Sequence, residues 1–480
     1  MKKVILFIVR SILFISILLV SLFGINEILL PKYTLRNSQW PTTSTYKGFY
    51  KMKKDTVDVL FIGSSTVVNA FIPQEIYNEY GIRSYNLGSE QQSLFLSYYW
   101  LKEALRSQTP SVIVLDTRFL YNVHPEFPIN TSEGLTRKCL DSMRFSSVKR
   151  DAVHEVCALD PGQSELSYYL TNLRYHDRWS SLTAADFDTS YAEAPLKGYG
   201  PIMGLGPESY EPFTEQDPDA WMEYPEMMME YLQKITDLCR EEGIRLVLVS
   251  LPGNEMDDAA NNVHKAFAKE NNIDYYNLCS RQYYEEIGAV LPEENAVGHE
   301  NVRGAVKTSR FIGRLLRDVY HVPSVKDDQY EQTKGFYEEV KKSAEQTLIT
   351  DPADYLRKLD TDRFTVFICG KGSLHSLPDT ISKALKDLGT EEIFTASAND
   401  AYFAMIHAGD VQEKTGEKLE VNGSFGSPKT SYTLQCDDSC TLTVNAKHHA
   451  GGTGLQVIVY DMNLGKVIDD TVIQPGEVIR

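Results

Sequence analysis

The sequence is poor in cysteine and in positive charge. Seven cysteines in 480 residues are too few for a disulfide scaffold, and their spacings match no zinc module. The 48 Lys and Arg against 66 Asp and Glu leave a net charge of −18, and no basic stripe offsets it, which argues against nucleic-acid binding. With 42% hydrophobic and 24% charged residues, the chain is not disordered, and at roughly 100–200 residues per domain it allows two or three domains.

Only one pair of cysteines lies close together in the sequence. Cys436 and Cys440 frame the segment CDDSC. Two states are possible for this pair: a disulfide across a turn, or two free buried thiols. The other five are expected to be small core residues. His448 and His449 do not predict a metal site, because adjacent strand residues point to opposite faces. No metal and no cofactor is expected.

Residues 1–30 predict a transmembrane signal anchor. Residues 4–26 form a 23-residue stretch whose only charge is Arg10, and about 20 apolar residues suffice to cross a bilayer core. Lys2, Lys3 and Arg10 lie at its amino-terminal end, which predicts a cytoplasmic N-terminus, with everything after about residue 30 outside. A cleaved signal peptide is the alternative, although the run is long and no A-x-A-like site follows it.

Residues 31–323 predict an α/β domain, because short apolar runs alternate with helical patterns. This alternation is typical of a parallel sheet with helices on both faces. Residues 119–224, rich in Gly, Pro and aromatics, are too long for a connector and predict a lid or substrate-shaping insertion. Strands are expected over residues 56–62, 83–87, 111–115, 244–251 and 273–278. Helices are expected over residues 73–80, 93–106, 225–242, 257–270 and 304–320.

The candidate chemistry lies at two places on one sheet edge. Ser65 follows the first expected strand after Gly63 and Ser64, although Gly-Ser-Ser is also ordinary turn chemistry. His299 stands shortly before the last expected helix. Functional groups of such sheets gather at the carboxyl ends of the strands. A lone loop histidine is more often structural, but a histidine placed here can serve Ser65 as general base.

These segments resemble the SGNH/GDSL hydrolase superfamily. The resemblance is carried by residues 58–65 (DVLFIGSS), residues 84–88 (SYNLG) and the segment around His299, and it spans roughly residues 55–320, including YHDRW at 175–179. More narrowly, the chain resembles membrane-anchored members that act on O-acyl groups of cell-surface polysaccharides. The resemblance implies a three-layer α/β/α fold, with Ser65 as nucleophile and His299 as base. It also implies an oxyanion hole made by the backbone N–H groups of Ser65 and Gly88.

Two positions depart from the family pattern. Ala296 stands where the family has an Asp three residues before its His. Glu293, Glu294 or a backbone carbonyl could replace that group; loss of an orienting carboxylate can cost around 10⁴ in rate. The Gly-x-Asn-Asp block is also missing after the third strand, where DTR stands at 116–118. Arg118 could stabilise an oxyanion or bind a substrate carboxylate, or it could be a solvated ion-pair partner.

Residues 324–350 predict a linker helix, and residues 351–480 a separate α+β domain. Residues 454–461 (GLQVIVYD) and 465–469 (GKVID) resemble the ILEI (interleukin-like EMT inducer) domain, with residues 364–409 in a permuted order. The resemblance implies a non-catalytic, lectin-like fold that binds carbohydrate; a structural or partner-docking domain is the alternative. Strands are expected over residues 364–369, 401–407, 431–436, 441–446, 455–461 and 467–472, and a helix over residues 377–388.

Together these expectations describe a single-pass, extracytoplasmic acyl esterase or O-acetyltransferase that acts on a cell-surface polysaccharide. A membrane-bound O-acyltransferase is the partner expected to supply acyl groups across the bilayer. The alternative is a catalytically degenerate scaffold that binds a surface glycan or that partner; Ala296 and the missing Asn block favour it.

Overall fold

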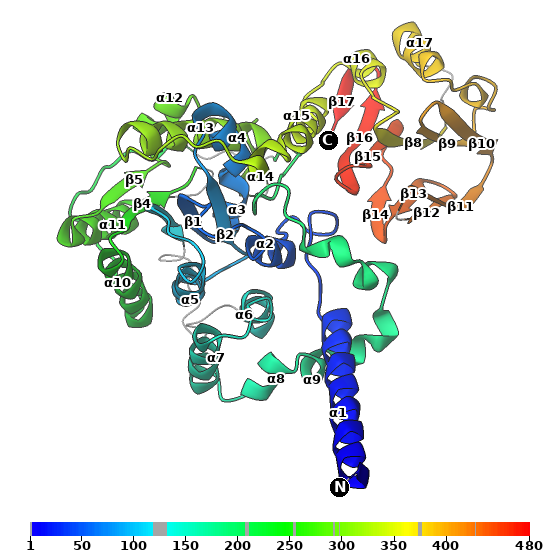
Figure 1. Cartoon of the computed structure of the whole chain (residues 1–480). Helices are drawn as coiled ribbons and strands as arrows, with labels where there is room; N and C mark the ends of the chain where they lie inside the picture. The colour runs from blue at the N-terminus through cyan, green and yellow to red at the C-terminus, as the bar shows by residue number, and fades with distance from the viewer. Residues whose placement is uncertain are drawn as a thin grey trace.

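A computed structural model describes residues 2–118, 132–206, 211–252, 256–290, 293–296, 298–372, 377–427 and 429–480. The first helix, α1 (Lys2–Leu29), projects away from the rest of the chain (Figure 1). Its segment Lys3–Leu29 is long and apolar enough to span a membrane, and its most apolar 18-residue window has a mean hydropathy of 2.7 and no buried residue. The predicted N-terminal apolar helix is therefore present. Residues 119–131 of the expected insertion lie outside the described residues.

A five-stranded parallel sheet forms the centre of the first domain, as predicted. The strands lie in the order β2-β1-β3-β4-β5. Each lies within a few residues of the expected segment, because buried parallel strands read as short continuous apolar runs. Their bounds are β1 (Val59–Gly63), β2 (Ser84–Gly88), β3 (Val112–Asp116), β4 (Arg245–Ser250) and β5 (Asp274–Asn277).

Helices cover both faces of this sheet. Alternate residues of β1 enter two different cores: Val59 and Phe61 pack on one face, and Leu60 and Ile62 on the other, as the two-residue period of a strand requires. The first face carries α3 (Ser65–Ala70), α4 (Pro73–Tyr80) and α13 (Val302–Asp318). The second carries α2 (Thr42–Phe49), α5 (Leu94–Ala104) and α10 (Glu226–Glu241). Helices α11 (Asp258–Asn271) and α12 (Arg281–Ile287) complete this region.

Residues 132–192 of the insertion are mostly helical, and this part packs against the end of α1. The backbone N–H of Asn172 donates to Asn26 Oδ1 at 2.9 Å, and Arg178 donates to the carbonyl of Leu29 at 2.6 Å. The insertion therefore fixes the domain to the anchor where the anchor ends (Figure 1). Its helices are α6 (Glu133–Leu140), α7 (Ser147–Leu159), α8 (Glu165–Tyr169) and α9 (Asn172–Tyr175), followed by the 3-10 segments η2 (His176–Ser181), η3 (Ala184–Phe187) and η4 (Thr189–Ala192).

The C-terminal region is built from two antiparallel sheets. One has the order β10-β9-β8-β15-β16-β17 and the other β11-β12-β13-β14. An aromatic and aliphatic core that includes Phe367, Phe403 and Tyr432 lies between them. The six-stranded sheet is β8 (Phe364–Lys371), β9 (Ala401–His407), β10 (Asp410–Gly416), β15 (Leu455–Asp461), β16 (Lys466–Gln474) and β17 (Glu477–Ile479). The four-stranded sheet is β11 (Leu419–Phe425), β12 (Thr430–Cys436), β13 (Cys440–Val444) and β14 (Lys447–Ala450).

Two details of the four-stranded sheet bear on the sequence predictions. The strand expected to reach residue 446 ends at Val444, because Asn445 and Ala446 adopt φ values of 50° and 63°, the left-handed conformation of a tight hairpin turn. On β14, His449 is buried beside Asp470, whereas His448 is exposed beside Thr443. The two imidazoles point to opposite faces, as the rejection of a metal site assumed.

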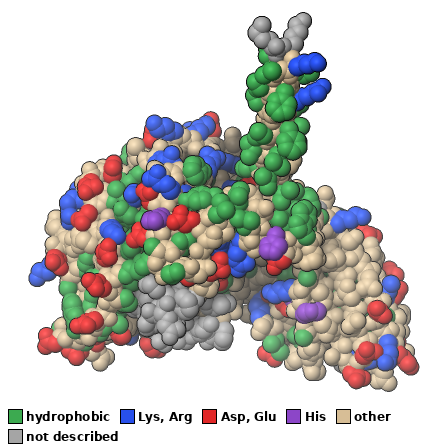
Figure 2. Space-filling model, turned by 90° about the horizontal axis from the view of Figure 1, so that it is seen from below, with side chains coloured by type: hydrophobic (Ala, Val, Ile, Leu, Met, Phe, Trp, Pro, Cys, Tyr) green, Lys and Arg blue, Asp and Glu red, His purple; other side chains and the backbone are tan. Residues whose placement is uncertain are grey.

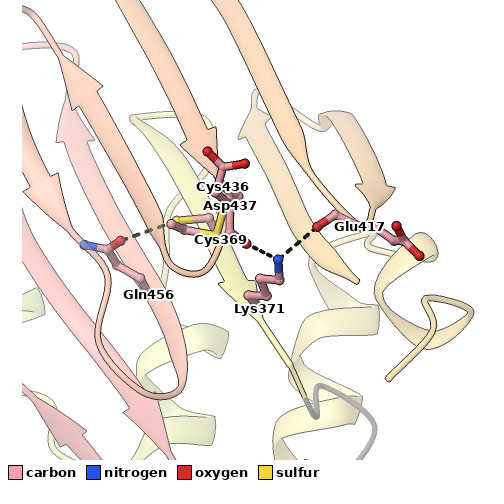
Figure 3. The surroundings of a disulfide bond; sticks show 7 residues. Cys369, Lys371, Glu417, Cys436, Asp437 and Gln456 are labelled. Carbon is pink, nitrogen blue, oxygen red and sulfur yellow. Dashed lines mark hydrogen bonds between the residues drawn. A yellow bond between two sulfur atoms is a disulfide. The ribbon is translucent and has the colours of Figure 1, made fainter. Parts of the chain in front are cut away.

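Cys436 and Cys440 form a disulfide, which decides between the two possibilities left open by the sequence. The bond closes the turn between β12 and β13, where Lys371 of β8 donates to the carbonyls of Glu417 and Asp437 (Figure 3). The other five cysteines are not disulfide-bonded.

The helix α15 (Lys334–Gln346) lies between the two sheet regions (Figure 1). It follows α14 (Asp328–Glu331), and α16 (Pro352–Arg357) and α17 (Asp379–Asp387) pack on the C-terminal side. The Tyr337 hydroxyl donates to Glu75 Oε2 at 2.7 Å, and Arg363 donates to Ser343 Oγ at 2.6 Å. One hydrophobic core joins residues of both regions across this helix. The segment expected to be a linker helix therefore packs against both sheet regions.

Candidate active site

Ser65 is the first residue of α3, directly after β1. Gly63, at the end of β1, lies against β3: a Cβ at position 63 would stand 2.7 Å from Asp116 Cβ and 2.8 Å from Val67 Cγ2. Only glycine allows this approach. The chain can therefore turn from strand to helix at the sheet edge and place Ser65 there.

The structure brings His299 to Ser65, as the sequence predicted. His299 lies on a short hairpin made by β6 (Asn295–Ala296) and β7 (His299–Glu300), immediately before α13. Its Nε2 is 2.8 Å from Ser65 Oγ, and both residues are 8% exposed. The pair has the distance and the burial that proton transfer from a serine nucleophile to a histidine base requires.

A buried carboxylate lies beneath this serine. Asp116 Oδ2 accepts hydrogen bonds from Thr66 Oγ1 and from Ser64 Oγ at 3.2 Å, and Asp116 Oδ1 accepts from the Arg118 backbone N–H at 3.0 Å. Burial raises the pKa of Asp116, and the hydrogen bonds from Thr66 and Arg118 oppose that rise. Both neighbours of Ser65 in the sequence are thereby tied to the end of β3, which fixes the first turn of α3.

The predicted oxyanion residues lie at the same edge. Gly88 pairs with Gly63 in the parallel register, and a Cβ at position 88 would lie 3.1 Å from the carbonyl oxygens of both Gly63 and Ser64. Gly88 is therefore packed against the backbone that carries Ser65. Arg118 follows β3 at this edge and is partly buried.

The two glutamates considered as replacements for the missing Asp are held elsewhere. Glu294 is ion-paired with Lys307 and accepts from the Val290 backbone N–H at 2.8 Å. Glu293 is exposed, and its carbonyl accepts from Asn301 at 2.9 Å. Ala296 itself pairs directly with His299 across the hairpin. Position 296 thus lies beside the imidazole and carries only a methyl group.

Sequence reasoning missed two residues next to this pair. The Trp40 ring lies 5.8 Å from the His299 ring, at 50° to it, and its Nε1 donates to Asn69 Oδ1 at 3.0 Å. Asn69 in turn donates to the Gly200 carbonyl at 2.6 Å. Trp40 belongs to the segment between the anchor and α2, and nothing in the sequence pattern signals that this segment returns to the sheet edge.

Glu300 is buried on the opposite side of the hairpin from His299. The Thr308 hydroxyl donates to its Oε1 at 2.7 Å, while Oε2 has no hydrogen-bond partner among the described residues. Burial raises the pKa of Glu300 to about 8. Within the described ranges, no group of three His, Cys, Asp or Glu side chains is placed to hold a metal ion.

No family model matches the chain, and no curated protein is significantly similar to it. The geometry of the site is therefore the basis for assigning it a chemistry.

Proposed function

We propose that the protein is an extracytoplasmic, membrane-anchored acyl esterase or O-acetyltransferase that acts on a cell-surface polysaccharide. The observation that carries this proposal is the 2.8 Å approach of Ser65 Oγ to His299 Nε2 at the carboxyl edge of a parallel sheet. Serine and histidine at this distance are the minimum constellation for nucleophilic acyl transfer. The resemblance to the SGNH/GDSL superfamily supplies the substrate class.

In the proposed reaction, Ser65 Oγ attacks the acyl carbonyl carbon and its proton passes to His299 Nε2. The backbone N–H groups of Ser65 and Gly88 stabilise the negative oxygen of the tetrahedral intermediate. The C–O bond to the leaving group breaks, His299 returns the proton to that oxygen, and an acyl-serine remains. Water then completes hydrolysis, or a sugar hydroxyl completes transfer. His299 takes the proton of the attacking hydroxyl, the bond between the acyl carbon and Ser65 Oγ breaks, and His299 returns the proton to Ser65 Oγ.

The localisation rests on the anchor and on the disulfide. Figure 2 shows α1 as an apolar rod with basic side chains toward its free end. The basic residues of this helix are Lys2, Lys3 and Arg10. Positive charge at that end favours a cytoplasmic N-terminus. The Cys436–Cys440 disulfide is typical of an oxidising compartment, which agrees with a C-terminal region outside the membrane.

The C-terminal region supports a role in holding the glycan. Its resemblance to the ILEI domain implies carbohydrate binding, and a rigid connection through α15 would keep a bound glycan close to the serine and raise its effective concentration. A membrane-bound O-acyltransferase is the partner proposed to deliver acyl groups in the transferase version of this function.

A second candidate function is a catalytically degenerate scaffold that binds a surface glycan or that acyltransferase. Ala296 favours it, because this residue faces His299 where the family has its orienting carboxylate. A serine and histidine without that group retain only part of the catalytic power of a triad.

The deciding experiment uses the full chain in detergent micelles with p-nitrophenyl acetate, read both by turnover and by intact-mass detection of an acetyl adduct. We expect Ser65→Ala and His299→Ala to lose both signals. Exposed residues of the same types provide matched controls, Ser180→Ala and His154→Ala, and these should behave as wild type. A folded wild-type protein that shows neither turnover nor adduct overturns the proposed enzymatic function and favours the scaffold.

A further inference from the structure

A cavity of about 520 Å³ lies where the two sheet regions meet, within the size range of small-ligand sites, roughly 300–1,000 Å³. Three parts of the chain form its wall: residues 36–39, which follow the anchor; residues 201–205 together with Ala296; and residues of the C-terminal sheets. Helix α15 packs between the two regions that form the cavity.

The cavity adjoins the Ser65–His299 pair. Ala296 is in its wall and is the direct cross-strand partner of His299. Side chains at directly opposed positions of an antiparallel pair project from the same face, so the imidazole projects toward the cavity side of the hairpin. Gln39, also in the wall, precedes Trp40, whose ring lies 5.8 Å from that of His299.

The wall is basic in a protein of net charge −18. Arg36, Lys447 and Lys466 line it, and none of its lining residues is acidic. These three cations form no ion pair with a carboxylate of the described ranges. Lys466 Nζ donates to the Pro201 carbonyl at 3.3 Å, and burial lowers the pKa of Lys466 to about 8. An anion in the cavity would stabilise the charged form of each group.

We propose that this cavity binds the carboxylate- or phosphate-bearing units of the glycan on which the neighbouring serine acts. The inference deepens the proposed function and rests on it, because it names the substrate as an anionic polysaccharide. Arginine and lysine form strong charge-assisted hydrogen bonds to carboxylate and phosphate oxygens. Ala296 fits this interpretation, because an aspartate there would place a negative charge in the wall of an anion site.

The test is calorimetric titration of the full chain in detergent micelles with three oligomers of equal length. Oligogalacturonate carries carboxylates, oligo(glycerol phosphate) carries phosphates, and an oligodextran is neutral. We expect one or both anionic oligomers to bind and the neutral oligomer not to bind, with an affinity that falls as salt is raised. The arm that binds more tightly identifies the anion.

The variants locate the site. Replacing Arg36 and Lys447 by glutamine should weaken anionic binding at least tenfold, whereas Lys383→Gln, an exposed charge on α17, should leave it unchanged. Equal losses in both variants, equal binding of a single-stranded DNA oligomer, or no binding of either anionic oligomer to the wild type would overturn the proposal.

Failure of this inference and failure of the proposed function give different results. Ser65→Ala should bind the anionic oligomer as the wild type does, since Ser65 is not part of the cavity wall. Anion binding without acyl chemistry would leave the cavity site standing and remove the enzyme. Acyl chemistry without anion binding would support the enzyme and rule out the anion site in the cavity.

Discussion

Ala296 and His299 face each other across the β6–β7 hairpin, so one short hairpin carries both a residue of the cavity wall and the imidazole that lies 2.8 Å from Ser65 Oγ. A substitution in this hairpin can therefore alter both the position of His299 beside Ser65 and the wall of the cavity. Position 296 therefore bears on both proposals.

A charge at position 296 should weaken binding of an anionic oligomer. Ala296 is 3% exposed, and a carboxylate there would repel an anion in the cavity, an unfavourable juxtaposition that can cost several kcal/mol. We expect Ala296→Asp to weaken calorimetric binding about tenfold or more. Ala296→Asn has nearly the same shape and provides the control for steric effects. If both variants bind equally well, the cavity is not the anion site.

Ser65, and not Ser64, should be the reactive serine. Ser64 is the N-cap of α3 and its hydroxyl bonds to Asp116 and Thr66, whereas Ser65 contacts His299. A fluorophosphonate probe should label the wild type and Ser64→Ala but not Ser65→Ala, with the label located by peptide mass spectrometry. Loss of an N-cap typically costs about 1 kcal/mol, so Ser64→Ala should also lower the melting temperature. Labelling that persists in Ser65→Ala contradicts the assignment.

Asp116 should act as a positioning residue for the serine. Its Oδ2 accepts bonds from both neighbours of Ser65, so the NH2 group of an amide in its place must face either those two hydroxyls or the Arg118 backbone N–H. We expect Asp116→Asn to lower kcat for p-nitrophenyl acetate about tenfold with a smaller change in KM, because a misplaced nucleophile loses rate more than binding.

The hydroxyl of Thr66 separates this role from simple destabilisation. Thr66→Ser keeps the hydroxyl that donates to Asp116 and should retain kcat, whereas Thr66→Val should lower it as Asp116→Asn does. If kcat falls in all three variants in proportion to the fall in their melting temperatures, the role of these residues is structural alone.

The parts of the site that the sequence predicted are those that depend on the parallel sheet. Ser65 and His299 could be placed because both flank buried elements whose ends must meet at one sheet edge. The hairpin itself was not predicted, because strands of two residues carry no periodic pattern. Trp40 was missed since its position depends on how the segment after the anchor folds back.

The same physical limit applies to the C-terminal region. The strands that were predicted there either have long buried runs, as in β15, or alternate between buried and more exposed residues, as in β13. Strand β10 alternates only between exposed and half-buried residues, so its sequence, DVQEKTG, has no apolar period that would indicate a strand. Its pairing along β9 supplies backbone hydrogen bonds that composition does not reveal.

Glu300 should make the protein less stable as the pH rises. Burial raises the pKa of this carboxyl from 4.5 to about 8, so the folded state holds the proton more tightly than the unfolded state. The stabilisation is fully present below about pH 4.5 and is lost as the pH rises through about 8. Glu300→Gln resembles the protonated acid and keeps an acceptor for Thr308.

The melting temperatures of wild type and Glu300→Gln should therefore diverge between pH 5 and pH 8.5, with the variant the more stable at the upper end. Every tenfold difference in proton affinity between the folded and unfolded states corresponds to about 1.4 kcal/mol of unfolding free energy. Parallel melting curves across this range would show that Glu300 is already ionised in the folded protein.

The insertion should touch the membrane surface beside the anchor. Trp179 is 57% exposed and Phe187 is 59% exposed. Both lie in segments joined to the end of α1: Arg178 donates to the Leu29 carbonyl at 2.6 Å, and Lys32 donates to the Asp186 carbonyl at 2.7 Å. An exposed tryptophan at the end of a membrane-spanning helix is expected at the headgroup level, where aromatic side chains are enriched.

Quenching of tryptophan fluorescence by brominated lipids in nanodiscs measures this contact. We expect the wild type to be quenched and Trp179→Phe to lose most of that quenching, because a bromine quenches only a ring that it can approach. Trp221 is the matched control, since it is 60% exposed and follows Ala220, whose carbonyl is bonded to Asn262 of α11, away from α1. Trp221→Phe should keep the wild-type response. A wild type that is not quenched, or a Trp179→Phe variant that is quenched as strongly as the wild type, would show that Trp179 does not face the bilayer.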